Sequence, residues 1–99
     1  PMLTGAFGKA YTAGLQTSAS EDRYLQGVAT MKHFAAYSLE DYQGVTRHTF
    51  DAEISVYDAA TTYFPSWRES VGGVSGARGV MCSYNEVNGV PSCANEWLL

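Results

Sequence analysis

Gly-Val-Met-Cys-Ser-Tyr-Asn-Glu-Val-Asn-Gly-Val-Pro-Ser-Cys-Ala-Asn, residues 79–95, is the stretch from which the rest of the chain is interpreted. Its opening residues Val80-Met81-Cys82 have the composition of a short buried strand. The polar residues Ser83-Tyr84-Asn85 follow at the carboxyl end of that strand, and Asn88-Gly89 predicts a tight turn. Asn95 is a suitable cap for a following helix. In parallel α/β proteins, ligands bind where a buried strand opens into a polar loop. The pattern alone also fits a core strand followed by an ordinary surface loop.

A second buried strand is predicted upstream, over Val28–Lys32, with Lys32 and His33 at its carboxyl end. Successive strand residues point to opposite faces, so these two side chains reach one ligand only if the backbone bends or bulges there. A strand–helix–strand order implies parallel pairing, which places both polar ends at the same edge of the sheet.

The helix between the strands is predicted to begin at Ser55, because Ser55-x-x-Asp58 fits a capping box. Pro65 lies inside the helical pattern and is expected to kink or split the helix near 61–64. Gly72-Gly73 ends it. Its apolar residues follow at steps of three and four and define one face, formed by Tyr57, Ala60, Phe64, Trp67 and Val71.

An earlier helix is predicted over Thr4–Gln16, and a polar loop is predicted over 16–22. The helix carries a large apolar face every four residues and three glycines that weaken it. The stretch 35–49 is expected to be a long loop that covers part of a pocket. Residues 50–54 are expected to be extended. The apolar face consists of Leu3, Phe7, Tyr11 and Leu15, and the glycines are Gly5, Gly8 and Gly14.

The composition excludes two classes of partner. The chain has 99 residues, 45% of them hydrophobic, a formal net charge of −4 and a pI of about 4.9. An acidic chain with scattered basic residues is not expected to bind nucleic acid. No apolar run approaches the roughly 20 residues that span a bilayer, so no membrane partner is expected.

The two cysteines, Cys82 and Cys93, lie eleven positions apart on either side of the predicted turn. A disulfide between them is one hypothesis if the protein is secreted, and two unpaired, partly buried thiols are the other. No Cys-x-x-Cys or paired histidine accompanies them, so a zinc site is not expected.

Three motifs in order resemble glycoside hydrolase family 3, and within it the fungal and plant β-xylosidases. The first motif is Lys32-His33-Phe34, and the second is 36–40 together with Gly44-Val45-Thr46-Arg47. The third is 81–85, continued by Val87-Asn88-Gly89 and by 91–95. The resemblance extends over nearly the whole chain. It implies a partial (β/α)8 TIM-barrel-like α/β segment in which residues 1–99 form an internal part of the barrel domain, incomplete at both ends.

The resemblance also implies which residues bind the sugar. Lys32 and His33 match a Lys-His pair that contacts sugar hydroxyls, and Met81 and Tyr84 match positions that line the same subsite. The alternative for Lys32 is an ammonium that reaches the surface, and for His33 a packed core histidine. For Met81 and Tyr84 the alternative is ordinary strand packing.

The resemblance assigns no catalytic residue to this chain. Retaining glycosidases need a nucleophile and an acid/base carboxyl on either side of the scissile bond. Family members carry the nucleophile in a Ser-Asp pair on a later strand, beyond the equivalent of Leu99, and the acid/base further on. Among the carboxylates here, Glu86 is the one to test. His48 is expected to lie on the surface.

These expectations amount to part of a secreted, retaining exo-β-xylosidase. It would release xylose from the non-reducing end of xylo-oligosaccharides, without a cofactor or metal. The segment would bind the oligosaccharide substrate and pack against the remainder of its own barrel and C-terminal domains. The alternatives are a β-glucosidase or α-arabinofuranosidase of the same family, or a non-catalytic carbohydrate-binding module.

Overall fold

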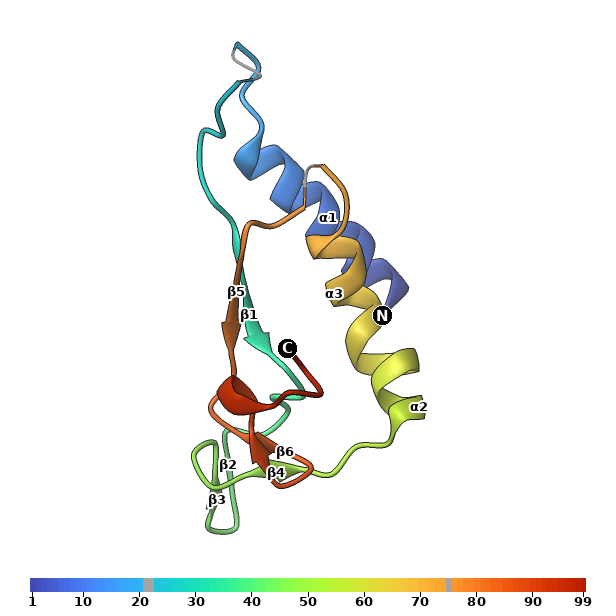
Figure 1. Cartoon of the computed structure of the whole chain (residues 1–99), viewed down its shortest axis with the longest axis vertical. Helices are drawn as coiled ribbons and strands as arrows, with labels where there is room; N and C mark the ends of the chain where they lie inside the picture. The colour runs from blue at the N-terminus through green and yellow to red at the C-terminus, as the bar shows by residue number, and fades with distance from the viewer. Residues whose placement is uncertain (21–22, 75) are drawn as a thin grey trace.

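The computed structural model describes residues 1–20, 23–74 and 76–99 as a mixed α/β segment (Figure 1). The predicted loop over 16–22 and the link before the second strand include Glu21, Asp22 and Ser75, which lie outside the described residues. The helical elements are α1 Met2–Gln16, α2 Val56–Asp58, a π-helical segment Ala59–Tyr63, α3 Phe64–Val71 and a 3-10 turn Ser92–Ala94. The strands are β1 Thr30–Phe34, β2 Asp41–Tyr42, β3 Val45–Thr46, β4 Asp51–Ala52, β5 Gly79–Cys82, β6 Glu86–Val87 and β7 Val90–Pro91.

The central pair, β1 and β5, is parallel, as the strand–helix–strand order predicts. Strand β5 lies where it is predicted, whereas β1 begins and ends two residues later than the predicted Val28–Lys32. The register pairs Lys32 with Met81 and Phe34 with Cys82, and it breaks at His33. The strand is therefore irregular at the Lys-His pair. Such an irregularity is required if both side chains are to face one ligand.

The helix layer is formed by α1 and α3, which lie against each other on one side of the strand pair (Figure 1). The contact face of α1 is made of small and polar residues, because Gly5, Thr12 and Gln16 are its buried positions. A Cβ on Gly5 would lie 3.1 Å from Cβ of Glu69, so the glycine allows the helices to approach closely. The glycines that weaken α1 as an isolated helix thus serve its packing.

The predicted apolar face of α1 does not pack in the described structure. Leu3, Phe7, Tyr11 and Leu15 are all exposed, and Phe7 keeps 70% of its surface accessible. The prediction of a shared face is correct for the geometry of the helix, but the small-residue face is the one buried against α3.

The second helical region starts and ends where the sequence predicts. Ser55 Oγ accepts the Asp58 backbone N–H at 3.0 Å and donates to Asp58 Oδ2 at 2.6 Å. Pro65 occupies the first turn of α3, and the chain before it winds into the π-helical segment, so the helix is split at the proline. Gly72 is the C-cap of α3.

The stretch 35–49 is more ordered than the predicted loop. It contains the antiparallel β2–β3 hairpin, whose turn residues Gln43 and Gly44 both have positive φ. Two consecutive residues with positive φ form the type I′ turn that suits a two-residue hairpin. Asn88 and Gly89 repeat this arrangement between β6 and β7, at the predicted turn.

A small second sheet forms beyond the carboxyl ends of β1 and β5. Its strands run in the order β4–β6–β7, so the extended piece predicted over 50–54 becomes the parallel partner of β6. A compact core forms beneath it around fully buried Val87, with Ala36 and Ala52. The half-buried residues packed against this core are Phe50, Ile54, Tyr63 and Leu98.

The last residues form a turn capped by Asn95, whose Oδ1 accepts the Trp97 N–H at 3.1 Å. The cap is present, and no helix follows it in the described chain. Within the ranges that the structure describes, no helix is both long and apolar enough to cross a bilayer.

Candidate functional site

Aromatic rings from three separate stretches meet beyond the carboxyl ends of β1 and β5. The His33 ring lies edge-on to Tyr37 with ring centroids 5.1 Å apart, and Tyr37 lies edge-on to Tyr84 at 6.5 Å. His33 and Tyr84 are both predicted site residues. The structure brings them together through Tyr37, which the sequence did not single out as a sugar-binding residue.

The β2–β3 region supplies further contacts to Tyr84. The His48 ring lies 4.7 Å from the Tyr84 ring, and the Arg47 guanidinium lies 5.3 Å from the same ring centroid. His48 is exposed, as predicted, but its ring packs on a predicted site residue. The stretch expected to cover a pocket thus contacts the loop after β5.

Glu40 links the Arg47 guanidinium to the Tyr37 hydroxyl. Its Oε1 accepts the Tyr37 hydroxyl at 2.9 Å, and its Oε2 lies 3.4 Å from a guanidinium nitrogen of Arg47. Partial burial, together with the hydrogen bond to Glu40, raises the pKa of Tyr37 above its ordinary value. The neighbouring Tyr37 hydroxyl, and then the Glu40 carboxylate, raise the pKa of Arg47. Tyr37 is therefore a neutral donor here and Arg47 a fixed cation.

Lys32 and Met81, the other predicted site residues, are register partners on β1 and β5. Both are exposed, Met81 to 49%. The Lys32 side chain makes no hydrogen bond or ion pair with any residue that the structure describes. An ammonium with three free donors and an exposed thioether beside it can contact a polyhydroxyl ligand.

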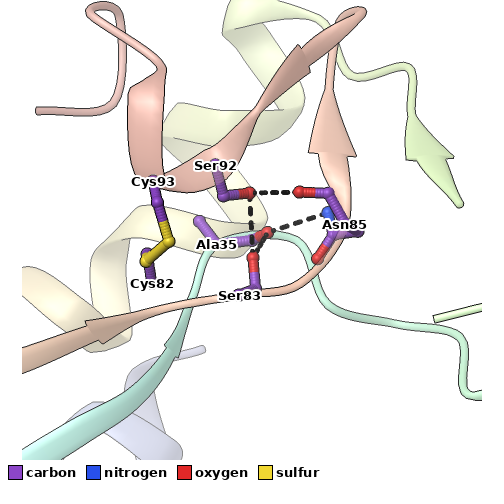
Figure 2. The surroundings of a disulfide bond; sticks show 6 residues. All are labelled: Ala35, Cys82, Ser83, Asn85, Ser92 and Cys93. Carbon is purple, nitrogen blue, oxygen red and sulfur yellow. Dashed lines mark hydrogen bonds between the residues drawn. A yellow bond between two sulfur atoms is a disulfide. The ribbon is translucent and has the colours of Figure 1, made fainter. Parts of the chain in front are cut away.

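A disulfide joins Cys82 to Cys93, with the two Cα atoms 5.3 Å apart (Figure 2). It ties the end of β5 to the 3-10 turn and closes the loop that carries Tyr84. Beside it, Ser83, Asn85 and Ser92 are buried and form hydrogen bonds with one another and with the Ala35 carbonyl. The loop after β5 is thus held both covalently and by a polar network.

Asn85 is fully buried, and its Nδ2 donates to the carbonyls of Ala35 at 3.3 Å and Glu86 at 2.8 Å. In the described part of the chain, its Oδ1 is a buried atom without a hydrogen-bond partner. A buried acceptor without a partner costs free energy, which the donor contacts of the same amide offset in part. Asn85 therefore braces the loop through these two donor contacts.

Neither of the two carboxylates nearest the cluster in the described sequence ranges, Glu40 and Glu86, forms a catalytic pair with the other. Glu86 is exposed on β6, and Glu40 is engaged with Tyr37 and Arg47. No group of three potential metal-ligating side chains occurs among the described residues. A large groove of about 1030 Å³ lies elsewhere, between the strands and the helices, and is lined by residues such as Phe34, Phe64, Trp67 and Val80.

Among known protein sequences, the chain is similar to β-xylosidases. No protein-family model matches the chain. A probable β-D-xylosidase 7 from Arabidopsis thaliana is 43% identical over the whole chain, and the match covers 13% of that protein. A probable exo-1,4-β-xylosidase from Aspergillus clavatus is 53% identical over 75% of the chain, and 10% of that protein is covered.

Comparison with solved structures gives the same family. An exo-β-xylosidase of glycoside hydrolase family 3, in complex with a xylobiose aziridine probe, superposes on 99% of the chain. The TM-score is 0.87 and the identity 37%, and the match covers 12% of that structure. A mutant β-glucosidase from Listeria innocua in complex with laminaribiose superposes with a TM-score of 0.78 at 32% identity, covering 13% of its chain. The chain thus spans about an eighth of the relatives that it matches.

Sequence and structure agree on the assignment. Identity is 37% or higher in the three β-xylosidase matches, and both superposed structures cover 99% of the chain. The chain therefore belongs to glycoside hydrolase family 3 and is similar along its length to the β-xylosidases of that family.

Proposed function

We propose that this chain is an internal part of the catalytic barrel of a secreted, retaining exo-β-xylosidase, in which it supplies sugar-recognition residues. The observation that carries the proposal is that His33 and Tyr84, at the carboxyl ends of two parallel strands, both pack on Tyr37, with Lys32 next to His33 on β1. In (β/α)8 barrels that edge holds the active site. The similarity to an exo-β-xylosidase bound to a xylobiose-derived probe supports a xylo-oligosaccharide as the substrate.

The chemistry assigned to these residues is binding and orientation of the sugar. Lys32 and His33 donate hydrogen bonds to hydroxyls of the terminal xylose, and the Tyr84 and Met81 side chains line the same subsite. The nucleophile and acid/base that carry out double displacement belong to other parts of the complete protein. Those parts include the rest of the barrel.

Secretion is part of the proposal, and the Cys82–Cys93 disulfide supports it, because such bonds persist in oxidising compartments. A β-glucosidase remains the second candidate, since β-glucosidases of known structure superpose on nearly the whole chain. Hydrolysis of aryl β-xylosides compared with aryl β-glucosides by the complete protein separates the two. An α-arabinofuranosidase is distinguished by its arabinoside substrate, and a binding module by the absence of hydrolysis.

The recognition role is tested by substituting Lys32→Ala and His33→Ala in the complete protein. Loss of a charge-assisted hydrogen bond is expected to cost about 2 kcal/mol, a loss of at least tenfold in kcat/KM. Lys9→Ala is the matched control, since Lys9 is an exposed lysine on α1 that pairs with Glu69. If Lys32→Ala and His33→Ala both leave kcat/KM within twofold of the wild type, the recognition role is wrong, whatever the enzyme hydrolyses.

A further inference from the structure

The loop after β5 alternates between buried and exposed side chains. Ser83 and Asn85 are buried, and Tyr84 between them is 59% exposed. Tyr84 and Asn85 lie in a bend between β5 and β6, and the burial of Ser83 and Asn85 determines which side chains of this bend face inward. Fixing Ser83 and Asn85 on the inner side therefore directs Tyr84 outward, toward Tyr37 and His48.

The number of protons fixes the direction of the hydrogen bonds in this network. Ser92 Oγ lies 2.7 Å from the Asn85 carbonyl, which can only accept, so Ser92 donates its single proton there. Ser92 Oγ can then only accept from Ser83 Oγ at 2.9 Å, and the single proton of Ser83 Oγ is shared between Ser92 Oγ and the Ala35 carbonyl at 3.1 Å. Ser92 is thus the central member, because it accepts from Ser83 and donates to the backbone of Asn85 (Figure 2).

The network also ties the two strand ends together. Asn85 Nδ2 donates to the Ala35 carbonyl, and the Ser83 backbone N–H donates to the Phe34 carbonyl at 2.8 Å. Ala35 lies two residues after His33 and two before Tyr37. The chain segment that carries the Lys-His pair is therefore fastened to the segment that carries Tyr84.

We propose that Ser92 is a positioning residue for the sugar site. It acts through Ser83 and Asn85 to hold the Lys32–Tyr37 segment in register with Tyr84. Ser92 itself is buried and belongs to the turn that contains Cys93. This inference rests on the proposed function, because it needs Lys32 and His33 to bind the sugar.

The test is a double-mutant cycle in the complete protein, with hydrolysis of an aryl β-xyloside as the readout. Ser92→Ala is expected to lower kcat/KM by about tenfold. In a Lys32→Ala background the same change should cost about twofold or less, because the contact that it misplaces is already absent. A residue that only stabilises the fold would lower kcat/KM by the same factor in both backgrounds.

The matched control is Ser70→Ala on α3. Ser70 is also a buried serine, and its Oγ donates to the Ser66 carbonyl at 2.8 Å, away from the sugar site. It should leave kcat/KM within twofold. The melting temperature is measured for every variant. Ser83→Ala, which leaves the bond from Ser92 to Asn85 in place, replaces Ser92→Ala if the latter shows no cooperative melt.

Each outcome decides the matter. Non-additivity of about fivefold or more between the serine variant and Lys32→Ala supports the proposal. Equal losses in both backgrounds, or a loss no greater than that of Ser70→Ala, overturn it and leave the proposed function intact. A wild-type protein that hydrolyses no aryl glycoside overturns the proposed function, and this inference with it.

Discussion

The carboxyl end of the β1–β5 strand pair and the helix layer beside it are held together by opposite means. At the carboxyl end, the buried side chains are small and polar, and a disulfide and directional hydrogen bonds fix their places. In the helix layer, the contact between α1 and α3 is a fit of small residues such as Gly5, while large apolar side chains such as Phe7 lie exposed.

The difference teaches where the geometry of each region comes from. Hydrogen bonds and a covalent bond have preferred directions, so the polar end is defined by its own residues. Apolar contact has no preferred direction. The geometry of the helix layer therefore depends on which surfaces of the neighbouring elements the helices can pack against. Four measurements on the complete protein test this contrast.

The largest effect is expected for Val87→Asp. Val87 is fully buried in the small core with Ala36 and Ala52, so an unpaired carboxylate there should cost roughly 3–5 kcal/mol of unfolding free energy. Phe7→Asp places the same charge on the exposed face of α1 and should stay within about 0.5 kcal/mol if that face is free. Denaturant unfolding measures both. A comparable cost for Phe7→Asp would break the comparison, because the face of α1 would then be covered in the complete protein.

Removing the disulfide is expected to have the next largest effect. Cys82→Ser with Cys93→Ser opens a loop with a sequence separation of eleven, and the chain-entropy model gives a loss of about 3 kcal/mol. Thermal unfolding of the double variant, compared with the wild type, measures it. A melting temperature unchanged by the substitutions would mean that the polar network alone fixes this end.

The helix contact is tested by a matched pair of glycines in α1. Gly5→Ala brings a methyl group against Ser66 and Glu69 of α3 and should destabilise by about 1–2 kcal/mol. Gly14→Ala meets open space and should stabilise by about 0.5–1 kcal/mol, since alanine favours the helix. Chemical denaturation distinguishes the signs. Stabilisation by both substitutions would show that α1 and α3 are loosely packed.

The smallest effect is a dependence on pH at the Tyr37 hydroxyl. Its pKa is raised by partial burial and by the Glu40 carboxylate, so the neutral form is favoured in the folded protein. The stabilisation is fully present below the ordinary tyrosine pKa of about 10 and is lost as the pH rises through the higher folded value. Tyrosinate absorbance of the wild type minus that of Tyr37→Phe gives this titration. A difference curve with a midpoint at or below 10 would contradict the assigned contact with Glu40.

The parts of the fold that the sequence predicts are those set by local chemistry. Ser55 identifies a helix start, Pro65 a break in the helix and Asn88-Gly89 a turn, because each depends on its nearest neighbours. The burial of α1 depends on the shape of α3, so the period of its apolar residues could not show that the glycine face would be the one packed.

The site residues also separate into those that local motifs predict and those that only the tertiary structure brings together. The motifs contain Tyr37 and Arg47 as well as His33 and Tyr84, but only His33 and Tyr84 are predicted to bind the sugar. Tyr37, Arg47 and His48 come into contact with them through the path of the 35–49 segment. A sequence shows the composition of such a segment and not where a hairpin directs it. The aromatic and charged residues within it were the available signal.

Buried and exposed side chains alternate over the six residues 83–88 that follow β5. Ser83, Asn85 and Val87 face inward, whereas Tyr84, Glu86 and Asn88 are exposed. A mutational library that varies positions 84 and 86 and keeps 83, 85 and 87 would change exposed side chains while the buried contacts of the loop stay the same. Substitutions at these two exposed positions should therefore change the surface of the loop without requiring further stabilising substitutions at the buried ones.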